Sequence, residues 1–398
     1  MCLDPCKRPE SLVNVLLCIP VLRCGGTEMQ TLNLVRVLRS AGYRVSVCCY
    51  YERDDAVVEM FRQAGADVLI MGLRRQQGAW VLIRELRKLI RSLRPDIVHV
   101  QYVAPGLLPV LAARLAGVRR LLATVHYPGR TVGPRARMFV RIASRLCRIF
   151  LCVSQSAERS WFGDSQVFDA AGSNGHRRHY TLYNAVDVDR IAMLADGVDH
   201  AAVRRRLGLG DGPVVGIVAR LRGEKGHAIL LDAMAEVVRE VPEARLLAVG
   251  DGADRDSLQE QARRLGIEGS VVWAGAKTQD EAFALYGVMD VVAVPSLFEG
   301  FGLSAAEAMA AGKPVVAAAA DGLVEVVVDG VTGYLTPIGD SKALADAILS
   351  IVTQPEQSRA MGLCARVEVA ERFSLKRLAD ATAAAYESVC GERRRNGE

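Results

Sequence analysis

Two glutamates eight residues apart, Glu299 and Glu307, are the most informative feature of this sequence. They enclose a glycine-bearing segment, with apolar runs at 291–295 before it and 315–318 after it. A loop between strands that opens a helix suits a phosphate, because the first N–H groups of a helix have no intrahelical partner and its dipole favours an anion. Glu307 falls one turn into that helix, where a carboxylate can accept from two ribose hydroxyls. Glu299 can accept from a second polyol, so the spacing fits phosphates flanked by sugars.

A second group able to do chemistry is the pair Arg220 and Lys225, which follows the apolar run 214–218. Two cations five residues apart, across a turn that contains glycine, can clamp a diphosphate and neutralise the charge that builds on a leaving nucleotide. Taken alone, the pattern is better explained by two surface cations on a loop. Their position favours a functional role, because ligands of open α/β sheets bind beyond the carboxyl ends of the strands.

Apolar runs alternate with helical patterns along most of the chain, and they fall into two series. Expected strands lie at 13–19, 45–49, 68–71, 97–100, 121–125 and 149–153, and then at 214–218, 246–249, 271–273, 291–294 and 315–318. Continuous apolar strands favour parallel sheets that are covered on both faces. The sequence therefore predicts two doubly wound α/β units in series.

The domain limits follow from this pattern. We expect an N-terminal domain at 1–187, a second domain at 188–374 and a C-terminal helical segment at 375–398. After residue 335 the pattern is purely helical, with helices at 341–352, 357–372 and 375–390, and residues 391–398 are expected to be frayed. Residues 164–180 are rich in Gly, Ser, Asn and His, which predicts an unusually long surface loop.

Composition places the chain among ordinary globular proteins. Its 398 residues allow two or three domains, and 51% are hydrophobic and 24% charged. The ten cysteines show neither a pairing pattern nor zinc-site spacing, and no secretory signal is visible, so we expect a reduced, cytoplasmic protein. No apolar run approaches the ~20 residues that a membrane-spanning helix needs. We expect no nucleic-acid partner.

Charge is distributed unevenly. No acidic residue occurs between Asp96 and Glu158, a stretch that holds nine arginines. Within it, residues 135–150 place arginines and apolar residues at helical spacing, which predicts a basic amphipathic helix. Such a helix can lie on an anionic membrane surface, which would make the protein peripheral on the inner face of the membrane. The alternative is an ordinary core-packed helix with a solvated basic face.

The segment from Glu299 to Glu307 resembles the signature of a known family. The resemblance includes Phe301, Gly302 and the later run Gly312-Lys313-Pro314-Val315-Val316. The family is that of the retaining GT-B glycosyltransferases of family 4, the group 1 glycosyl transferases. Arg220 to Gly226 is similar to the family's Arg-Leu-x-x-x-Lys-Gly, and Gly25-Gly26 resembles its Gly-Gly-x-Glu loop. The resemblance covers about 13–390. It implies an α/β GT-B fold of two Rossmann-like doubly wound parallel-sheet domains facing a cleft, with the last helix returning towards the N-terminal domain.

The resemblance also implies an activity. A retaining hexosyltransferase of this family moves a hexosyl group from a nucleotide-diphosphate sugar to a hydroxyl of a lipid-linked glycan, a polysaccharide or a small molecule. It uses no cofactor and no metal, and the leaving diphosphate itself helps to deprotonate the acceptor. Two alternatives share the fold, namely a non-hydrolysing nucleotide-sugar epimerase and a non-catalytic sugar-nucleotide-binding subunit.

Carried over to this sequence, the family's roles fall on twelve residues. Arg220 and Lys225 would bind the diphosphate, Glu307 the ribose, and Glu299 the sugar, with His126 facing that sugar from the other domain. The remaining donor-binding residues would be Gly25, Gly26, Gly250, Lys277, Phe301, Gly302 and Leu303, of which Lys277 would contact the base and the last three the sugar through backbone atoms.

The sequence departs from the family at several positions. Asp321 stands where the family has the first of two glycines, which adds a charge near the sugar pocket, and Gln101 stands where a second histidine often follows His99. Asp187-Val188-Asp189 spells the metal element of the other main transferase fold, but it lies in the family's domain-junction segment and is expected to be structural. The chain has no dinucleotide fingerprint, no Walker motif and no nucleophile elbow, which disfavours other nucleotide enzymes and hydrolases.

Overall fold

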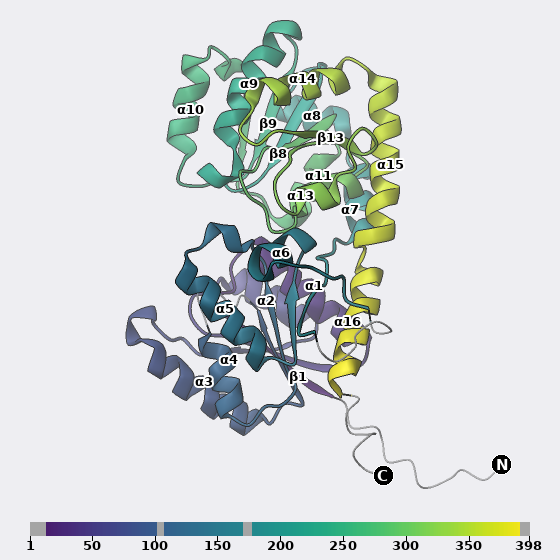
Figure 1. Cartoon of the computed structure of the whole chain (residues 1–398). Coiled ribbons are helices and arrows are strands. Elements are labelled where there is room, and N and C mark those ends of the chain that lie inside the picture. The colour runs from purple at the N-terminus through teal and green to yellow at the C-terminus, as the bar shows by residue number, and fades with distance from the viewer. Residues whose placement is uncertain (1–12, 102–106, 170–176, 391–398) are drawn as a thin grey trace, which may run out of the picture. The chain divides into compact units, whose positions relative to one another are not determined.

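The computed structural model describes residues 13–101, 107–169 and 177–390 (Figure 1). Contacts divide the chain into two compact units. One comprises Met1–Tyr183 with Leu378–Glu398, and the other comprises Asn184–Arg377. The fraying expected at 391–398 lies outside the described residues. Each unit has its own parallel sheet, as the apolar runs predict.

The N-terminal unit contains seven parallel strands in the order β3-β2-β1-β4-β5-β6-β7. Their bounds are β1 Asn14–Ile19, β2 Arg44–Cys49, β3 Asp67–Ile70, β4 Ile97–Gln101, β5 Leu121–Val125, β6 Ile149–Cys152 and β7 His179–Thr181. The first six match predicted strands to within a residue or two. Strand β7 was not predicted, because it has only three residues, of which the first two fall inside the expected loop at 164–180.

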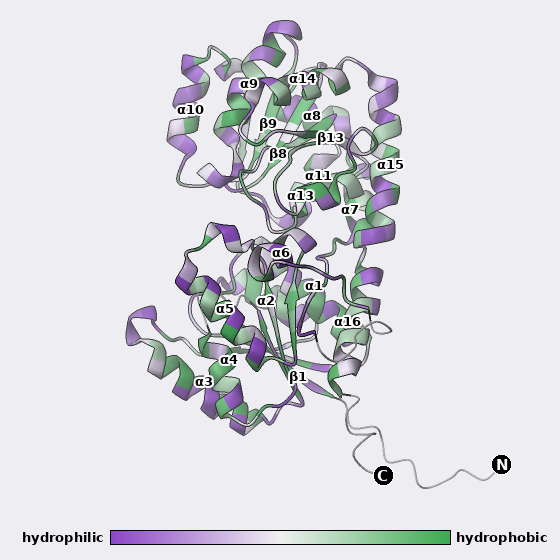
Figure 2. Ribbon diagram, viewed as in Figure 1, coloured by the Kyte–Doolittle hydropathy of each residue, from purple (hydrophilic) through white to green (hydrophobic). Residues whose placement is uncertain are grey.

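Both faces of this sheet are buried. Val15, Leu17 and Ile19 of β1 belong to one core, whereas Leu16 and Cys18 belong to the other. The first core is covered by α1 (Gly26–Ser40), α2 (Asp55–Gln63) and α16 (Leu375–Cys390), and the second by α3 (Ala79–Leu93), α4 (Leu108–Leu115), α5 (Pro134–Leu146) and α6 (Gln155–Phe162). Burial on both faces explains why the strands are apolar throughout. Figure 2 shows how hydrophobic and hydrophilic residues alternate along the covering helices.

The C-terminal unit contains six parallel strands in the order β10-β9-β8-β11-β12-β13. They are β8 Val214–Val218, β9 Arg245–Val249, β10 Val271–Gly275, β11 Val291–Val294, β12 Val315–Ala318 and β13 Gly333–Thr336. Its helices are α7 Val188–Asp196, α8 His200–Leu207, α9 His227–Glu240, α10 Arg255–Arg264, α11 Gln279–Tyr286, α12 Leu303–Ala310, α13 Leu323–Val326, α14 Ser341–Val352 and α15 Pro355–Phe373. Strand β13 was not predicted, because it is short and begins with a glycine.

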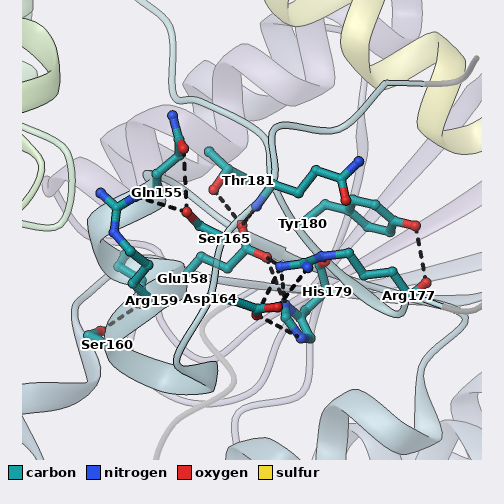
Figure 3. A network of polar contacts seen from close by, with 12 residues as sticks. Gln155, Glu158, Arg159, Ser160, Asp164, Ser165, Arg177, His179, Tyr180 and Thr181 are labelled. Atoms are coloured by element: carbon teal, nitrogen blue, oxygen red, sulfur yellow. Dashed lines mark hydrogen bonds and ion pairs between the residues drawn. The ribbon is translucent and has the colours of Figure 1, made fainter. Parts of the chain in front are cut away.

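A buried carboxylate holds the described ends of the segment predicted as a long loop (Figure 3). Glu158 is fully buried and accepts hydrogen bonds from Arg177 at 2.9 Å and from the Thr181 hydroxyl at 2.7 Å, and it contacts His179 Nδ1 at 2.7 Å. Arg177 also forms a two-pronged ion pair with Asp164. A buried charge is costly unless it is paired. The network around Glu158 therefore fixes both described ends of the segment, near Asp164 and at residues 177–181. Residues 170–176 lie outside the described residues.

Candidate active site

The C-terminal unit places two loops at the point where its strand order reverses. From β8 the chain proceeds to β9 and β10 on one side, and it then returns to β11 on the other side of β8. The loop after β8 carries Arg220 and Lys225, and the loop after β11 carries Glu299. The crevice between two such loops, beyond the carboxyl ends of the strands, is where open α/β sheets bind their ligands.

An ion pair joins the two loops. Lys225 Nζ lies 2.6 Å from Glu299 Oε2, and the two side chains are 22% and 17% exposed. The Ser296 hydroxyl lies 3.4 Å from the same carboxylate oxygen. An ammonium group has three N–H donors, so Lys225 can hold Glu299 and still donate to a phosphate. The structure therefore brings together Lys225, predicted to bind the diphosphate, and Glu299, predicted to bind the sugar.

The turn after β9 supports the loop that carries Arg220. Gly250 has a φ of 138°, and a Cβ at this position would lie 2.0 Å from the Ala219 carbonyl oxygen. The Leu221 N–H donates to the Asp251 carbonyl at 3.1 Å. Gly250 is thus required for the close approach of the two loops. The sequence placed it only in a turn beside the nucleotide and did not indicate this packing role. Arg220 itself is exposed, and its side chain has no partner among the described residues.

Phe301 and Gly302 shape the start of α12. Phe301 is 2% exposed and its ring makes an edge contact with Phe373, so its side chain belongs to the core. Gly302 has a φ of 106° and precedes the first helical residue, Leu303. Because the first N–H groups of a helix lack intrahelical partners, the backbone of this segment can receive an anion or a sugar oxygen. The predicted contact of this backbone with the donor sugar stays a prediction.

Glu307 lies one turn into α12 and is half-buried. Its carboxylate accepts a hydrogen bond from the hydroxyl of buried Tyr286 at 3.1 Å. Burial raises the pKa of Glu307 from 4.5 to about 7, and the Tyr286 hydrogen bond opposes this shift. A carboxylate with one such partner retains acceptor capacity for further hydroxyl groups.

The N-terminal unit holds three further predicted residues. Gly25 is the N-cap of α1, in an extended conformation, and Gly26 is the first helical residue. His126 follows β5, and its Nε2 lies 2.9 Å from the Gln101 side-chain oxygen. Its Nδ1 is buried and has no partner among the described residues. Burial lowers the pKa of His126 to about 4, so the ring is neutral near pH 7 and Nδ1 is an acceptor when Nε2 carries the proton.

The structure groups only some of the predicted residues. The loop after β8 carries Arg220 and Lys225, and Gly250 contacts that loop from the turn after β9. The loop after β11 and the helix α12 that follows it carry Glu299, Phe301, Gly302, Leu303 and Glu307. Lys277 is exposed after β10, an edge strand two places from β8. Gly25, Gly26 and His126 belong to the other unit.

Two residues beside this site were not predicted from the sequence. Tyr286 supports Glu307, and it is the last residue of α11, a helix without any of the motifs singled out in the sequence. His227 is 4% exposed, directly follows Gly226, and has no hydrogen-bond partner for either ring nitrogen among the described residues. Burial, and secondarily the charge of Lys225, lower the pKa of His227 to about 4, so it adds no charge to the clamp near pH 7.

Asp187, the first residue of Asp187-Val188-Asp189, has a structural role at the junction. The side chain of Asp187 accepts a hydrogen bond from the Arg190 N–H and is the N-cap of α7. Across residues 13–101, 107–169 and 177–390, no group of three or more His, Cys, Asp or Glu side chains is arranged to hold a metal ion.

Two parallel-sheet units, with the paired cation and carboxylate at the switch point of the second, define a protein of GT-B architecture. Two family models match the sequence: Glycosyltransferase Family 4 over residues 24–190, and Glycosyl transferases group 1 over residues 199–367. Together with the relatives below, these matches show that the chain belongs to the group 1, or family 4, glycosyltransferases.

Two similar bacterial proteins are glycosyltransferases by name. The chain is 40% identical over 224 residues to a D-inositol 3-phosphate glycosyltransferase from Segniliparus rotundus, covering 53% of this chain and 50% of that protein. It is 34% identical over 284 residues to a GDP-mannose-dependent alpha-(1-6)-phosphatidylinositol monomannoside mannosyltransferase from Mycolicibacterium smegmatis, covering 68% of this chain and 71% of that protein. The match thus spans about half the length of the first relative.

Solved structures share the fold at lower identity. The Anabaena protein HepE in complex with UDP-glucose superposes with a TM-score of 0.79 at 24% identity, covering 94% of this chain and 99% of that one. Sucrose-phosphate synthase from Thermosynechococcus elongatus gives a TM-score of 0.78 at 21% identity, covering 96% and 100%. At these identities the likeness shows the fold.

Proposed function

We propose that the chain transfers a hexosyl group from a nucleotide-diphosphate sugar to a hydroxyl acceptor, with retention of configuration and without a metal ion. The observation that carries this proposal is the Lys225–Glu299 pair of 2.6 Å across the switch point, with Glu307 one turn further on. These residues offer one cation for a diphosphate and two carboxylates for hydroxyl groups. The name of the Mycolicibacterium relative, a GDP-mannose-dependent enzyme, supports a donor of this class.

In the proposed reaction, the bond between the sugar C1 and the diphosphate oxygen breaks, and a bond from C1 to the acceptor oxygen forms on the same face. The acceptor proton passes to the departing diphosphate. Lys225 and Arg220 stabilise the negative charge that grows on that group, and the N-terminus of α12 adds its dipole. Glu307 holds the ribose and Glu299 the sugar. The contact between His126 and the sugar stays a prediction.

Incubation with labelled sugar nucleotides separates this activity from its alternatives. We expect slow release of nucleoside diphosphate from one donor, with the sugar appearing first as the anomer present in the donor, as followed by NMR. Transfer to an added acceptor should outpace that release. A change of configuration at a ring carbon would indicate an epimerase, and binding without turnover would indicate a non-catalytic subunit.

We expect activity to survive chelation. The charge of the diphosphate is assigned to Lys225, Arg220 and the α12 N-terminus, which require no divalent ion. The measurement is the initial rate of transfer before and after treatment with EDTA. A complete loss that added Mg²⁺ or Mn²⁺ restores would contradict the assignment.

The acceptor is proposed to lie at an anionic membrane surface. On α5, Arg135, Arg141 and Arg145 are exposed, together with Met138 (51%) and Phe139 (40%). Arg137 is half-buried and donates to the Gly129 carbonyl, so it also has a structural role. Exposed apolar residues among arginines suit the headgroup region of an anionic bilayer. No helix that the structure describes is long and apolar enough to cross a bilayer.

Helix α3 covers the same face of the sheet as α5 and strengthens this proposal. Trp80 is 82% exposed at its first turn, and Arg84, Lys88 and Arg91 continue the same stripe at helical spacing. Glu85 pairs with Arg84 and is the only acidic residue of this helix. A helical pattern was expected in this region, but its basic stripe was not singled out, because the arginine-rich stretch identified in the sequence begins after Asp96.

Flotation with anionic vesicles at low salt tests the surface. We expect wild-type protein to float and the variant Arg135→Ser/Arg145→Ser to float less, because each basic residue near an anionic surface contributes about 1 kcal/mol before screening. The variant Trp80→Ala should also float less, because it removes an exposed ring that suits the headgroup region. The charge-matched control is Arg263→Ser/Arg264→Ser on α10 of the other unit, which should float normally. If wild-type protein stays unbound, both helices are solvated basic faces and a soluble acceptor is favoured.

A further inference from the structure

Asp321 occupies a backbone conformation that favours glycine. It follows β12 and has a φ of 40°, and within the described residues the only other non-glycine residue with positive φ is Arg94, the C-cap of α3. An L-residue in this region is strained unless its surroundings hold it there, and such residues concentrate at functional sites. The strain at Asp321 therefore requires a compensating interaction.

That interaction is a reciprocal pair of hydrogen bonds with Glu299. The Glu299 N–H donates to Asp321 Oδ2 at 3.1 Å, and the N–H of the next residue, Gly322, donates to the Glu299 carbonyl at 3.1 Å. The contact is tight, because a Cβ on Gly322 would lie 2.6 Å from both the Gly300 carbonyl oxygen and the Phe301 Cα. Both backbone polar groups of Glu299 are thus fixed by the dipeptide Asp321-Gly322.

We propose that Asp321 is a positioning residue that sets the Glu299 carboxylate against Lys225 and so orients the sugar of the donor. The side chain of Glu299 is fixed at one end by Lys225 at 2.6 Å and at the other by its own backbone, which Asp321 anchors. Without Asp321, the loop after β11 keeps the Gly322 hydrogen bond but loses the one at the Glu299 N–H. The consequence for donors rests on the proposed glycosyl transfer, whereas the anchoring of the loop does not.

Three substitutions separate the carboxylate from the backbone strain. Asp321→Gly relieves the strain but removes the acceptor. Asp321→Asn keeps a side-chain oxygen acceptor and tolerates the left-handed region well. Asp321→Ala keeps the strain and removes the acceptor. If Asp321 served only the fold, Asp321→Gly would be the best tolerated of the three variants, because it relieves the backbone strain. If Asp321 positions Glu299, Asp321→Asn should be the best tolerated, because it alone keeps the hydrogen-bond acceptor.

The first measurement needs no donor. Hydrogen–deuterium exchange over residues 297–303 should be about tenfold faster in Asp321→Gly than in wild type, because the Glu299 amide loses its acceptor. Asp321→Asn should restore most of the protection, and exchange in the sheet of the same unit should not change. Equal exchange in wild type and Asp321→Gly overturns the proposal, whatever the protein binds.

The second measurement uses sugar nucleotides and free nucleoside diphosphates. In Asp321→Gly we expect kcat/KM for the donor to fall about tenfold while the affinity for the free nucleoside diphosphate stays within twofold, because Glu299 contacts only the sugar. Asp321→Asn should stay within about threefold of wild type. Equal weakening of both ligands, or full activity in Asp321→Gly, overturns the positioning role. A wild-type protein that binds neither ligand would instead remove the proposed function.

Discussion

Replacement of Lys225 by alanine is expected to lower kcat about a hundredfold without unfolding the protein. Lys225 Nζ is the cation that bridges the switch-point loops. In the proposed reaction its charge faces the diphosphate as that group departs. Removing one donor that stabilises developing charge in a water-poor site typically costs about 3 kcal/mol of transition-state stabilisation. Arg220→Ala should act in the same direction, and less strongly, because Arg220 is exposed.

The matched control for Lys225→Ala is Arg222→Ala, which removes an exposed cation three residues away in the same turn. It should keep near-normal turnover. Circular dichroism and thermal melts of both variants establish that the fold is intact. If Lys225→Ala turns over like wild type, or if the control loses as much activity, Lys225 does not bind the diphosphate.

Replacement of Glu307 by glutamine is expected to lower the affinity for the sugar nucleotide and the affinity for the free nucleoside diphosphate to the same extent. The proposed partner of Glu307 is the ribose, which both ligands contain. Hydrogen bonds to a charged acceptor contribute about 1.5 to 3 kcal/mol, so calorimetry should show a loss of tenfold or more in each affinity. Unchanged affinity for the free nucleoside diphosphate would exclude the ribose contact.

The same variant should change how stability and binding depend on pH. Because burial raises the pKa of Glu307 from 4.5 to about 7, the folded state retains a proton that the unfolded state has already lost between these values. The free energy of unfolding of the wild type therefore falls as pH rises through this window. Glu307→Gln lacks that fall, so its advantage in stability should grow from nearly zero at pH 4.5 to as much as about 3 kcal/mol at pH 8.

Binding should show the opposite trend. Only the ionised carboxylate accepts from both ribose hydroxyls, so the affinity of the wild type for a nucleoside diphosphate should rise between pH 6 and pH 8. Any residual pH dependence in Glu307→Gln belongs to the phosphates of the ligand. Thermal melts and calorimetry of both proteins at three pH values measure the two trends. Parallel curves for the two proteins would show that Glu307 does not titrate in this range.

Much of the fold could be predicted because each central strand is apolar on both faces. The strand 214–218 and the other central strands can be recognised from the local sequence alone, because a strand buried on both faces is a continuous run of apolar residues. The short edge strands His179–Thr181 and Gly333–Thr336 have no such run, and their pairing depends on a neighbouring strand. Strand order likewise depends on crossovers that a local pattern does not encode.

The site was predictable where its chemistry sits in a short motif. Lys225, Glu299 and Glu307 lie in recognisable segments, and the structure brings the first two into contact. The residues that support them come from elsewhere in the sequence, namely Tyr286 beneath Glu307 and Asp321 behind Glu299. Asp321 was noticed only as a departure from glycine, and its hydrogen bond to a backbone 22 residues earlier requires the folded sheet.

The most direct test of the account is the structure of this protein with a bound nucleoside diphosphate, either UDP or GDP. We expect diphosphate oxygens within hydrogen-bonding distance of Lys225 Nζ and of the first N–H groups of α12, and both ribose hydroxyls on the Glu307 carboxylate. The Lys225–Glu299 pair should persist, with the ammonium group donating to both partners. A diphosphate bound away from the loops after β8 and β11, or a ribose that does not contact Glu307, would contradict the assignment of the donor site.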